Sequence, residues 1–189
     1  AGQRIFVYAE QGFGDTLQFC RFLPLLSNMG AEVLFECQRP LVTLCQSMSG
    51  VQQVFARNDR IPEAEYYIPL MSLPRVLSTT LETIPAEVPY LCANNKQISE
   101  FAHRLKNTNL CAGLVWLGNP KRQNDAMRSC TWSALDPILS VADIKFISLQ
   151  VGIEPSEIPP TMENFGEYCG NFLDTASAIE ALDIVITVD

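Results

Sequence analysis

The sequence predicts an α/β protein with a GT-B-like arrangement, in which each of two domains is a Rossmann-like parallel sheet. Short apolar runs typical of buried strands alternate with segments of helical period in the first half. The alternation lapses in a proline-containing stretch at 72–95 and resumes after residue 108. We therefore expect one domain at 1–107 and a second at 108–189. We expect the second to be incomplete, because the chain stops at Asp189, directly after a strand.

In the first domain four apolar runs predict the strands of a parallel sheet. These runs cover residues 4–9, 31–37, 51–56 and 66–71. A helix is predicted from Asp15, because apolar residues recur at helical spacing as far as Leu26, and Gly30 is expected to end it. A second helix is predicted between Pro40 and Gly50. The stretch after the fourth strand predicts one short helix and an extended crossing segment.

The second half repeats this organisation after a polar helix near 96–106. Strands are predicted over 110–117, 144–150 and 183–188, and helices over 131–140 and 174–182. In a parallel sheet the carboxyl ends of the strands carry the loops that contact ligands. We therefore expect the residues of a functional site in the loops after these strands.

Composition excludes several classes of protein. Of the 189 residues 48% are apolar and 18% are charged, and the net charge is −8, which argues against nucleic acid as a partner. No run approaches the roughly 20 apolar residues of a membrane span. Seven cysteines without a C-x-x-C pair predict free core thiols in a reducing compartment, and hence a cytoplasmic location. A single histidine, His103, leaves little for a metal site, and we expect neither metal nor cofactor.

The turn Gly12-Phe13-Gly14-Asp15 joins the first strand to the first helix. Asp15 has a structural interpretation, as an N-cap with Gln18 completing a capping box, and a chemical one, as a general base. The position of a third fingerprint glycine holds Leu17, which disfavours a dinucleotide site and thus a nucleotide-dependent oxidoreductase.

A second candidate is the loop after the strand at 110–117, where Lys121, Arg122 and Arg128 form the main cationic cluster. Arginine suits phosphate binding, although a solvated run of charges explains the cluster equally well. Trp116 and Trp132 flank this loop, and we expect them to pack rather than to stack on a nucleotide base.

Four stretches together resemble the glycosyltransferase family nine domain, the heptosyltransferase-like proteins. They are "EQGFGDTLQFCRFLPLL", "SLPRVLSTTLETIPAEVPYL", "GLVWLGNPKRQNDAMRS" and "ALDIVITVD". They occur in family order over nearly the whole chain and look most like the branch that follows tetratricopeptide repeats in bacterial proteins. The resemblance implies a GT-B fold with two domains facing across a cleft, without a metal. It also implies inverting transfer of a sugar from a nucleotide-diphosphate donor to an acceptor hydroxyl.

By this resemblance Asp15 is the catalytic base. The donor phosphates would meet Lys121, Arg128 and Asp189, and the acceptor side would include Gly12, Gly14, Thr80 and Glu82, the last two of which also fit a purely structural loop.

The chain departs from the family in three places. Arg128 leads into Ser-Cys-Thr where heptosyltransferases have Lys followed by Trp-Pro, and Ala126 stands where the repeat-linked branch often has Arg. The family continues beyond the position of Asp189 into a Thr-rich, His-containing loop that grips the donor.

These departures leave a second hypothesis open, an inactive binding or scaffolding module attached to the repeats. We also expect the isolated 189-residue chain not to catalyse transfer. The exposed sheet edge of a shortened second domain is a place where a second copy could pair, giving a homo-oligomer.

Overall fold

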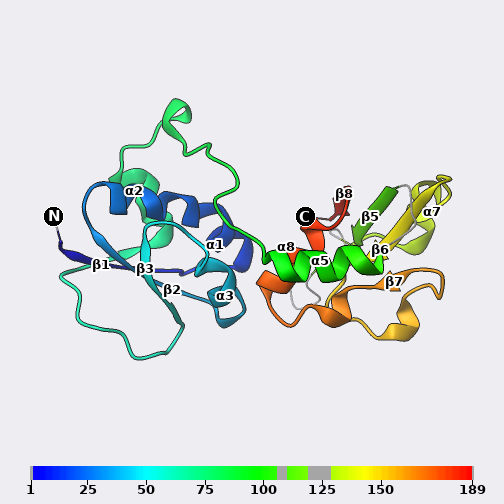
Figure 1. Cartoon of the computed structure of the whole chain (residues 1–189). Helices are drawn as coiled ribbons and strands as arrows, with labels where there is room; N and C mark the ends of the chain where they lie inside the picture. The colour runs from blue at the N-terminus through cyan, green and yellow to red at the C-terminus, as the bar shows by residue number, and fades with distance from the viewer. Residues whose placement is uncertain (1, 106–109, 119–128, 189) are drawn as a thin grey trace. The chain divides into compact units, whose positions relative to one another are not determined.

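The computed structural model describes residues 2–105, 110–118 and 129–188. The chain forms two compact units, Ala1–Cys92 (unit 1) and Ala93–Asp189 (unit 2), each built on a four-stranded sheet whose strand pairs are all parallel (Figure 1). The expected α/β class with two Rossmann-like sheets is thus confirmed. The chain divides into these units between residues 92 and 93, whereas the sequence pattern places the domain boundary between 107 and 108.

Unit 1 contains the four predicted strands in the order β3-β2-β1-β4. Their bounds are β1 Arg4–Tyr8, β2 Glu32–Cys37, β3 Val51–Ala56 and β4 Tyr66–Pro69. The chain runs outward from β1 through β2 to β3 and then returns to the other side of β1. The strand order therefore reverses between β1 and β4, which is where sheets of this type place their ligands.

Short helices connect these strands. They are α1 Phe13–Phe19, η1 Cys20–Phe22, α2 Leu23–Asn28, η2 Arg39–Leu41, α3 Val42–Cys45, η3 Leu70–Ser72, α4 Leu73–Val76 and η4 Leu81–Thr83. Gly30 follows the end of α2 with positive φ, as predicted for a C-terminal glycine. Gly50 also has positive φ, but the prediction that it ends a helix is wrong, because α3 ends five residues earlier, at Cys45. Leu23, Val33 and Phe35 are completely buried between these helices and the sheet.

Unit 2 repeats the strand order of unit 1 as β7-β6-β5-β8. Its strands are β5 Leu110–Val115, β6 Ile144–Ser148, β7 Glu163–Asn164 and β8 Ile184–Thr187. β7 was not predicted, because two polar residues make no apolar run. The helices are α5 Asn95–Arg104, α7 Trp132–Leu139 and α8 Phe172–Glu180, with short turns η5 Pro155–Glu157 and η6 Gly166–Tyr168.

Two apolar clusters form the core of unit 2, and alternating β5 side chains enter both. Cys111 packs in a cluster with Phe101 of α5 and Ala178 of α8, while Leu114 packs in the other with Leu135 of α7. Because successive side chains of a strand point to opposite faces, the helices cover the sheet on both sides.

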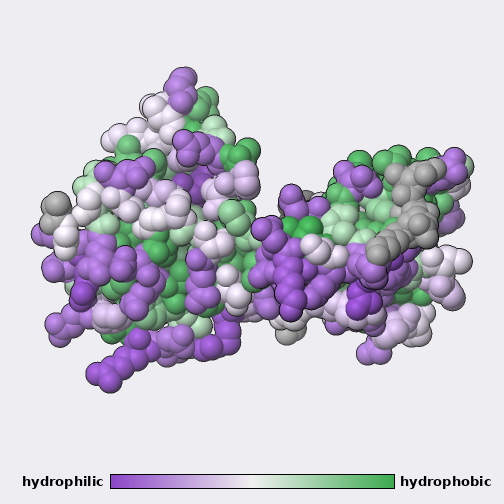
Figure 2. Space-filling view, viewed as in Figure 1, coloured by the Kyte–Doolittle hydropathy of each residue, from purple (hydrophilic) through white to green (hydrophobic). Residues whose placement is uncertain are grey.

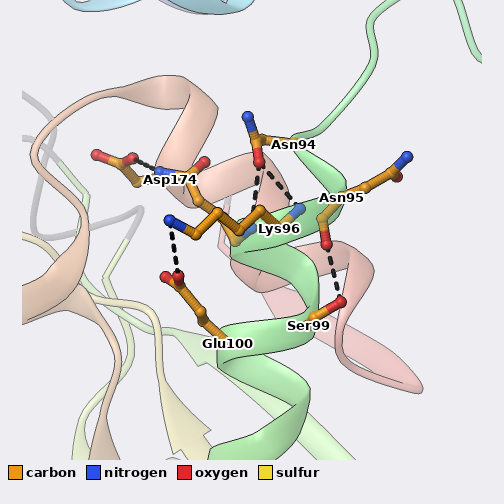
Figure 3. A network of polar contacts seen from close by, with 7 residues as sticks. Asn94, Asn95, Lys96, Ser99, Glu100 and Asp174 are labelled. Carbon is orange, nitrogen blue, oxygen red and sulfur yellow. Dashed lines mark hydrogen bonds and ion pairs between the residues drawn. The ribbon is translucent and has the colours of Figure 1, made fainter.

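Helix α5 belongs to unit 2 because a polar network holds it on α8 (Figure 3). Asn94 caps α5 through its side chain, and its backbone N–H donates to Ser177 Oγ at 3.2 Å. Gln97 Nε2 donates to Asp174 Oδ1 at 2.6 Å, and the buried Ser177 hydroxyl contacts Gln97 Oε1 at 3.1 Å. A buried polar group that lacks a partner costs free energy, so these bonds fix the start of α5 on unit 2.

The outer face of α5 is hydrophilic in Figure 2, and His103 is exposed on it, as expected for a solvated face. Over the described part of the chain, no helix combines the length and apolar character that crossing a bilayer requires.

Candidate functional site

The candidate site lies at the carboxyl end of β1 in unit 1. The residues just beyond this strand are held from both sides. Arg57, after β3, donates to the carbonyl oxygen of Ala9 at 2.5 Å, and the N–H of Met71, after β4, donates to Glu10 Oε1 at 3.2 Å. The segment that leads from β1 into α1 is thereby anchored where the strand order reverses.

Asp15 lies in the first turn of α1 and is partly exposed. Its Oδ2 accepts a hydrogen bond from the N–H of Gly12 at 3.1 Å, and Gly12 is the N-cap, with extended angles of φ −74° and ψ 178°. The prediction that Asp15 is the N-cap is therefore wrong: it is the third residue of the helix, and Gln18 does not complete a capping box. The reason is local, because a carboxylate at this position reaches back to an otherwise unpaired N–H.

The two glycines of the turn are not required by its backbone angles. Gly12 has negative φ, and Gly14 lies inside α1. A Cβ built on Gly14 would meet no atom within 4 Å. The surface above Gly14 is open, so a ligand can approach the backbone closely there.

Sequence reasoning missed Thr16 and Gln38. The Thr16 side chain is 1% exposed, and its hydroxyl oxygen lies 3.0 Å from both the carbonyl of Gly12 and Oε1 of Gln38. Gln38 Nε2 donates to the carbonyl of Gln11 at 2.7 Å. Gln38 thus clamps the turn that carries Asp15. Its position, directly after the buried strand at 31–37, was the available signal.

Unit 2 has a corresponding clamp. Gln150, beyond β6, accepts hydrogen bonds through Oε1 from the N–H groups of Trp116 and Leu117, at 3.3 and 3.0 Å. Its Nε2 lies 3.4 Å from the carbonyl of Leu117. The rings of Trp116 and Trp132 have centroids 4.5 Å apart at an interplanar angle of 44°, within a core cluster. The prediction that these tryptophans pack is confirmed.

The predicted donor-side residues Lys121, Arg122, Arg128 and Asp189, together with Ala126, lie outside the described residues. On the acceptor side Thr80 is the N-cap of η4, and its N–H donates to Thr83 Oγ1 at 2.8 Å. A hydrogen bond from the Thr80 side chain lowers the pKa of Glu82, which is fully exposed. Both residues therefore have local structural partners.

A cavity of about 480 Å³ lies in unit 1, between the α1–η1 helix and the segment at 74–84. Gln18, Phe19 and Phe22 line one wall, and Thr80, Leu81 and Ile84 line the other. The structure thus brings Thr80 to the same cavity as the helix that carries Asp15, while Glu82 does not line it.

Two solved structures share this fold. The glycosyl transferase family 9 protein of Veillonella parvula DSM 2008 aligns with a TM-score of 0.68 and 10% identity, covering 98% of this chain and 75% of that one. ADP-heptose LPS heptosyltransferase II of E. coli aligns with a TM-score of 0.62 and 10% identity, covering 98% and 79%. Neither protein-family models nor curated protein sequences gave a match. At this identity the likeness establishes the fold, which is that of GT-B glycosyltransferases.

Proposed function

We propose that this chain supplies the fold of an inverting glycosyltransferase that moves a sugar from a nucleotide-diphosphate donor to an acceptor hydroxyl. The observation that carries the proposal is Asp15, a partly exposed carboxylate at the carboxyl end of β1, in a chain that shares its fold with two glycosyltransferases. The loop after this strand is a favoured ligand position in such sheets.

Asp15 is the general base in this proposal. The acceptor oxygen forms a bond to the anomeric carbon as the bond from that carbon to the diphosphate oxygen breaks. The leaving group departs with the electron pair, and the hydroxyl proton passes to the Asp15 carboxylate. A single displacement inverts the configuration. A carboxylate is a weak base, but bond formation acidifies the hydroxyl, so transfer to it becomes favourable as the reaction proceeds.

The carboxylate is positioned by one of its two oxygens. Oδ2 is occupied by the Gly12 N–H, and within the described residues no hydrogen bond to Oδ1 is found. Oδ1 is therefore the oxygen that we assign to the acceptor. Gln38 and Thr16 act as positioning residues, because they hold the turn rather than touch the substrate.

The remaining assignments follow from the resemblance. Lys121, Arg128 and Asp189 are proposed for the donor phosphates, where cations would stabilise the charge that develops on the leaving diphosphate. Association with tetratricopeptide repeats and pairing of a second copy at a sheet edge also stay predictions. Within unit 2, β8 pairs with β5 along one side, and Ile184 is 53% exposed.

The test is Asp15→Asn in the protein that carries this chain, with release of nucleoside diphosphate measured over a panel of nucleotide-diphosphate sugars. We expect a loss of about 10²- to 10⁴-fold in kcat. Asparagine can still accept from Gly12, so the thermal midpoint should change little. Asp136→Asn, at an exposed position of α7, is the matched control and should keep full turnover.

Unchanged turnover in folded Asp15→Asn would refute the assignment of the base. Donor binding without turnover in the unaltered protein would favour the alternative, an inactive binding or scaffolding module. Ala126, at a position where the repeat-linked branch often has Arg, is one of the departures from the family that keep this alternative open.

A further inference from the structure

The cavity in unit 1 has the size and lining of a small-molecule site. Its volume of about 480 Å³ is within the range of roughly 300–1,000 Å³ that is usual for ligand pockets. Apolar side chains dominate the lining, and a few polar groups, such as Gln18 and Thr79, are placed among them. This mixture of a mostly apolar wall and sparse polar groups is typical of sites for compact organic ligands.

Aromatic rings form one wall of the cavity. Phe19 and Phe22 have ring centroids 6.2 Å apart at an interplanar angle of 24°. Across from them, Leu81 is 85% exposed and Ile84 is 42% exposed. Figure 2 shows hydrophobic colour on the segment that protrudes at the top of unit 1, to which these two residues belong. Ring faces favour offset or edge-to-face contact with another ring, and the opposite wall offers apolar surface that is not yet buried.

The cavity favours an uncharged ligand, because its lining is mostly apolar and burying an unpaired charge costs free energy. Arg21 is the charged residue of the lining. Its Nε donates to the carbonyl of Gln18 at 3.0 Å, and Nη2 donates to Tyr90 Oη at 3.0 Å. The guanidinium also stacks 4.7 Å above the ring of Tyr90. Arg21 is therefore engaged in tying the segment at 85–90 to the helix.

Asp15 lies on the same helix face as one wall of the cavity. Gln18, Phe19 and Phe22 follow it by three, four and seven residues, the spacing that places side chains one above the other along a helix. The cavity therefore begins about one helical turn, or roughly 5 Å, from the carboxylate.

We propose that this cavity binds the acceptor, and that the acceptor is a neutral compound with an aromatic ring joined through a short spacer to the reacting hydroxyl. The ring lies against Phe19 and Phe22, and the hydroxyl extends toward Asp15. Naming the ligand as the acceptor rests on the proposed function, whereas the binding of such a compound does not.

The probe is 2-phenylethanol, titrated into the ¹⁵N-labelled protein and followed by amide chemical shifts and saturation transfer from the protein. We expect shifts concentrated in residues 18–22 and 79–84. The anion 3-phenylpropionate and the alkyl alcohol 1-octanol should each bind at least fivefold more weakly. Equal binding of the anion would overturn the assigned charge, and equal binding of octanol would overturn the aromatic assignment.

Variants at exposed positions locate the site without threatening the fold. Leu81→Asn and Ile84→Asn should each weaken the binding of 2-phenylethanol at least fivefold. Val88→Asn is the matched control, because Val88 is 74% exposed and does not line the cavity, and it should bind within twofold of the unaltered protein. Shifts that map elsewhere, or equal binding by all three variants, would refute the proposal.

The Asp15→Asn variant separates this proposal from the proposed function. Its affinity for 2-phenylethanol should be within twofold of that of the unaltered protein, because the carboxylate charge is not what holds the ring. Full transfer activity in Asp15→Asn with intact probe binding would refute the base and leave the cavity site standing. Loss of transfer in Asp15→Asn, together with no probe binding by the unaltered protein, would refute the cavity site and leave the base standing.

Discussion

Unit 1 and unit 2 use the same strand order and the same type of clamp, but they clamp different atoms. Gln38 holds its turn through the Thr16 hydroxyl and the carbonyl of Gln11. Gln150 accepts directly from the N–H groups of Trp116 and Leu117. A glutamine beyond the second strand can therefore serve a repeated topology in two ways. What each turn can do chemically depends on its own residues, and in unit 1 it presents Asp15.

The two units also differ in how much space they leave at glycines. A Cβ on Gly14 of unit 1 would meet nothing within 4 Å, whereas one on Gly166 of unit 2 would lie 2.1 Å from the carbonyl oxygen of Gln150. The open glycine lies beside the candidate base, and the crowded one lies against the backbone of the clamp residue. The open space at Gly14 therefore leaves a route by which a ligand can approach unit 1, whereas the lack of space at Gly166 reflects tight packing in unit 2.

The largest effect that we predict tests this contrast. Gly166→Ala should lower the free energy of unfolding by about 3 kcal/mol, because the backbone of Gln150 must move. Gly14→Ala should leave stability unchanged or raise it by about 0.5–1 kcal/mol, since alanine favours a helix interior. Urea denaturation followed by circular dichroism measures both. Similar unfolding midpoints for the two variants would show that the difference in space has no energetic consequence.

A smaller effect distinguishes the two clamps. Gln150→Ala should lower the free energy of unfolding by about 2 kcal/mol, because the N–H of the buried Trp116 loses its partner. Gln38→Ala should lower it by only about 1 kcal/mol, because the Thr16 hydroxyl keeps the carbonyl of Gly12 as an acceptor.

Both tryptophans, Trp116 and Trp132, lie in unit 2, so their fluorescence during urea unfolding reports on that unit. The Gln150→Ala change should therefore appear in tryptophan fluorescence. A larger loss of stability in Gln38→Ala than in Gln150→Ala would reverse the proposed ranking.

The smallest effect concerns how each unit holds the end of its third strand. In unit 1 the carboxylate of Asp59 accepts from the N–H of Ala56 at 3.0 Å and from Arg39 at 2.9 Å. Both partners lower the pKa of Asp59, and the N–H of Ala56 has the larger effect. In unit 2 the uncharged Asn164 accepts from the N–H of Gly166 at 3.0 Å.

Because the folded-state pKa of Asp59 is depressed, its stabilising effect is present above the unfolded value of about 3.9 and is lost as pH falls through the folded value. The difference in thermal midpoint between the unaltered protein and Asp59→Asn should therefore shrink on acidification from pH 7. Asp136→Asn controls for the change in net charge. A difference in midpoint that stays constant down to pH 2 would contradict this role of Asp59.

Much of the fold was predictable from particular runs of residues. "VQQVFA" predicted β3 with the bounds that the structure has, because four of its six residues are apolar over the length of a strand, although only Ala56 is buried in this edge strand. Glu163–Asn164 gave no such signal, since β7 is a strand only through pairing with β6. The role of Asp15 as a helix N-terminal residue was predictable, but its position was not, because Gly12 rather than Asp15 has the extended conformation of an N-cap.

Local sequence by itself determined the alternation of strands and helices and the presence of a carboxylate at the end of β1, because buried runs and helical periodicity are properties of neighbouring residues. Only the tertiary structure decided that α5 belongs with α8, that Gln38 and Gln150 are clamps, and that a cavity adjoins the helix of Asp15. Each of these depends on bonds or contacts between residues far apart in the chain, such as Asn94 with Ser177, and no local pattern specifies such a pairing.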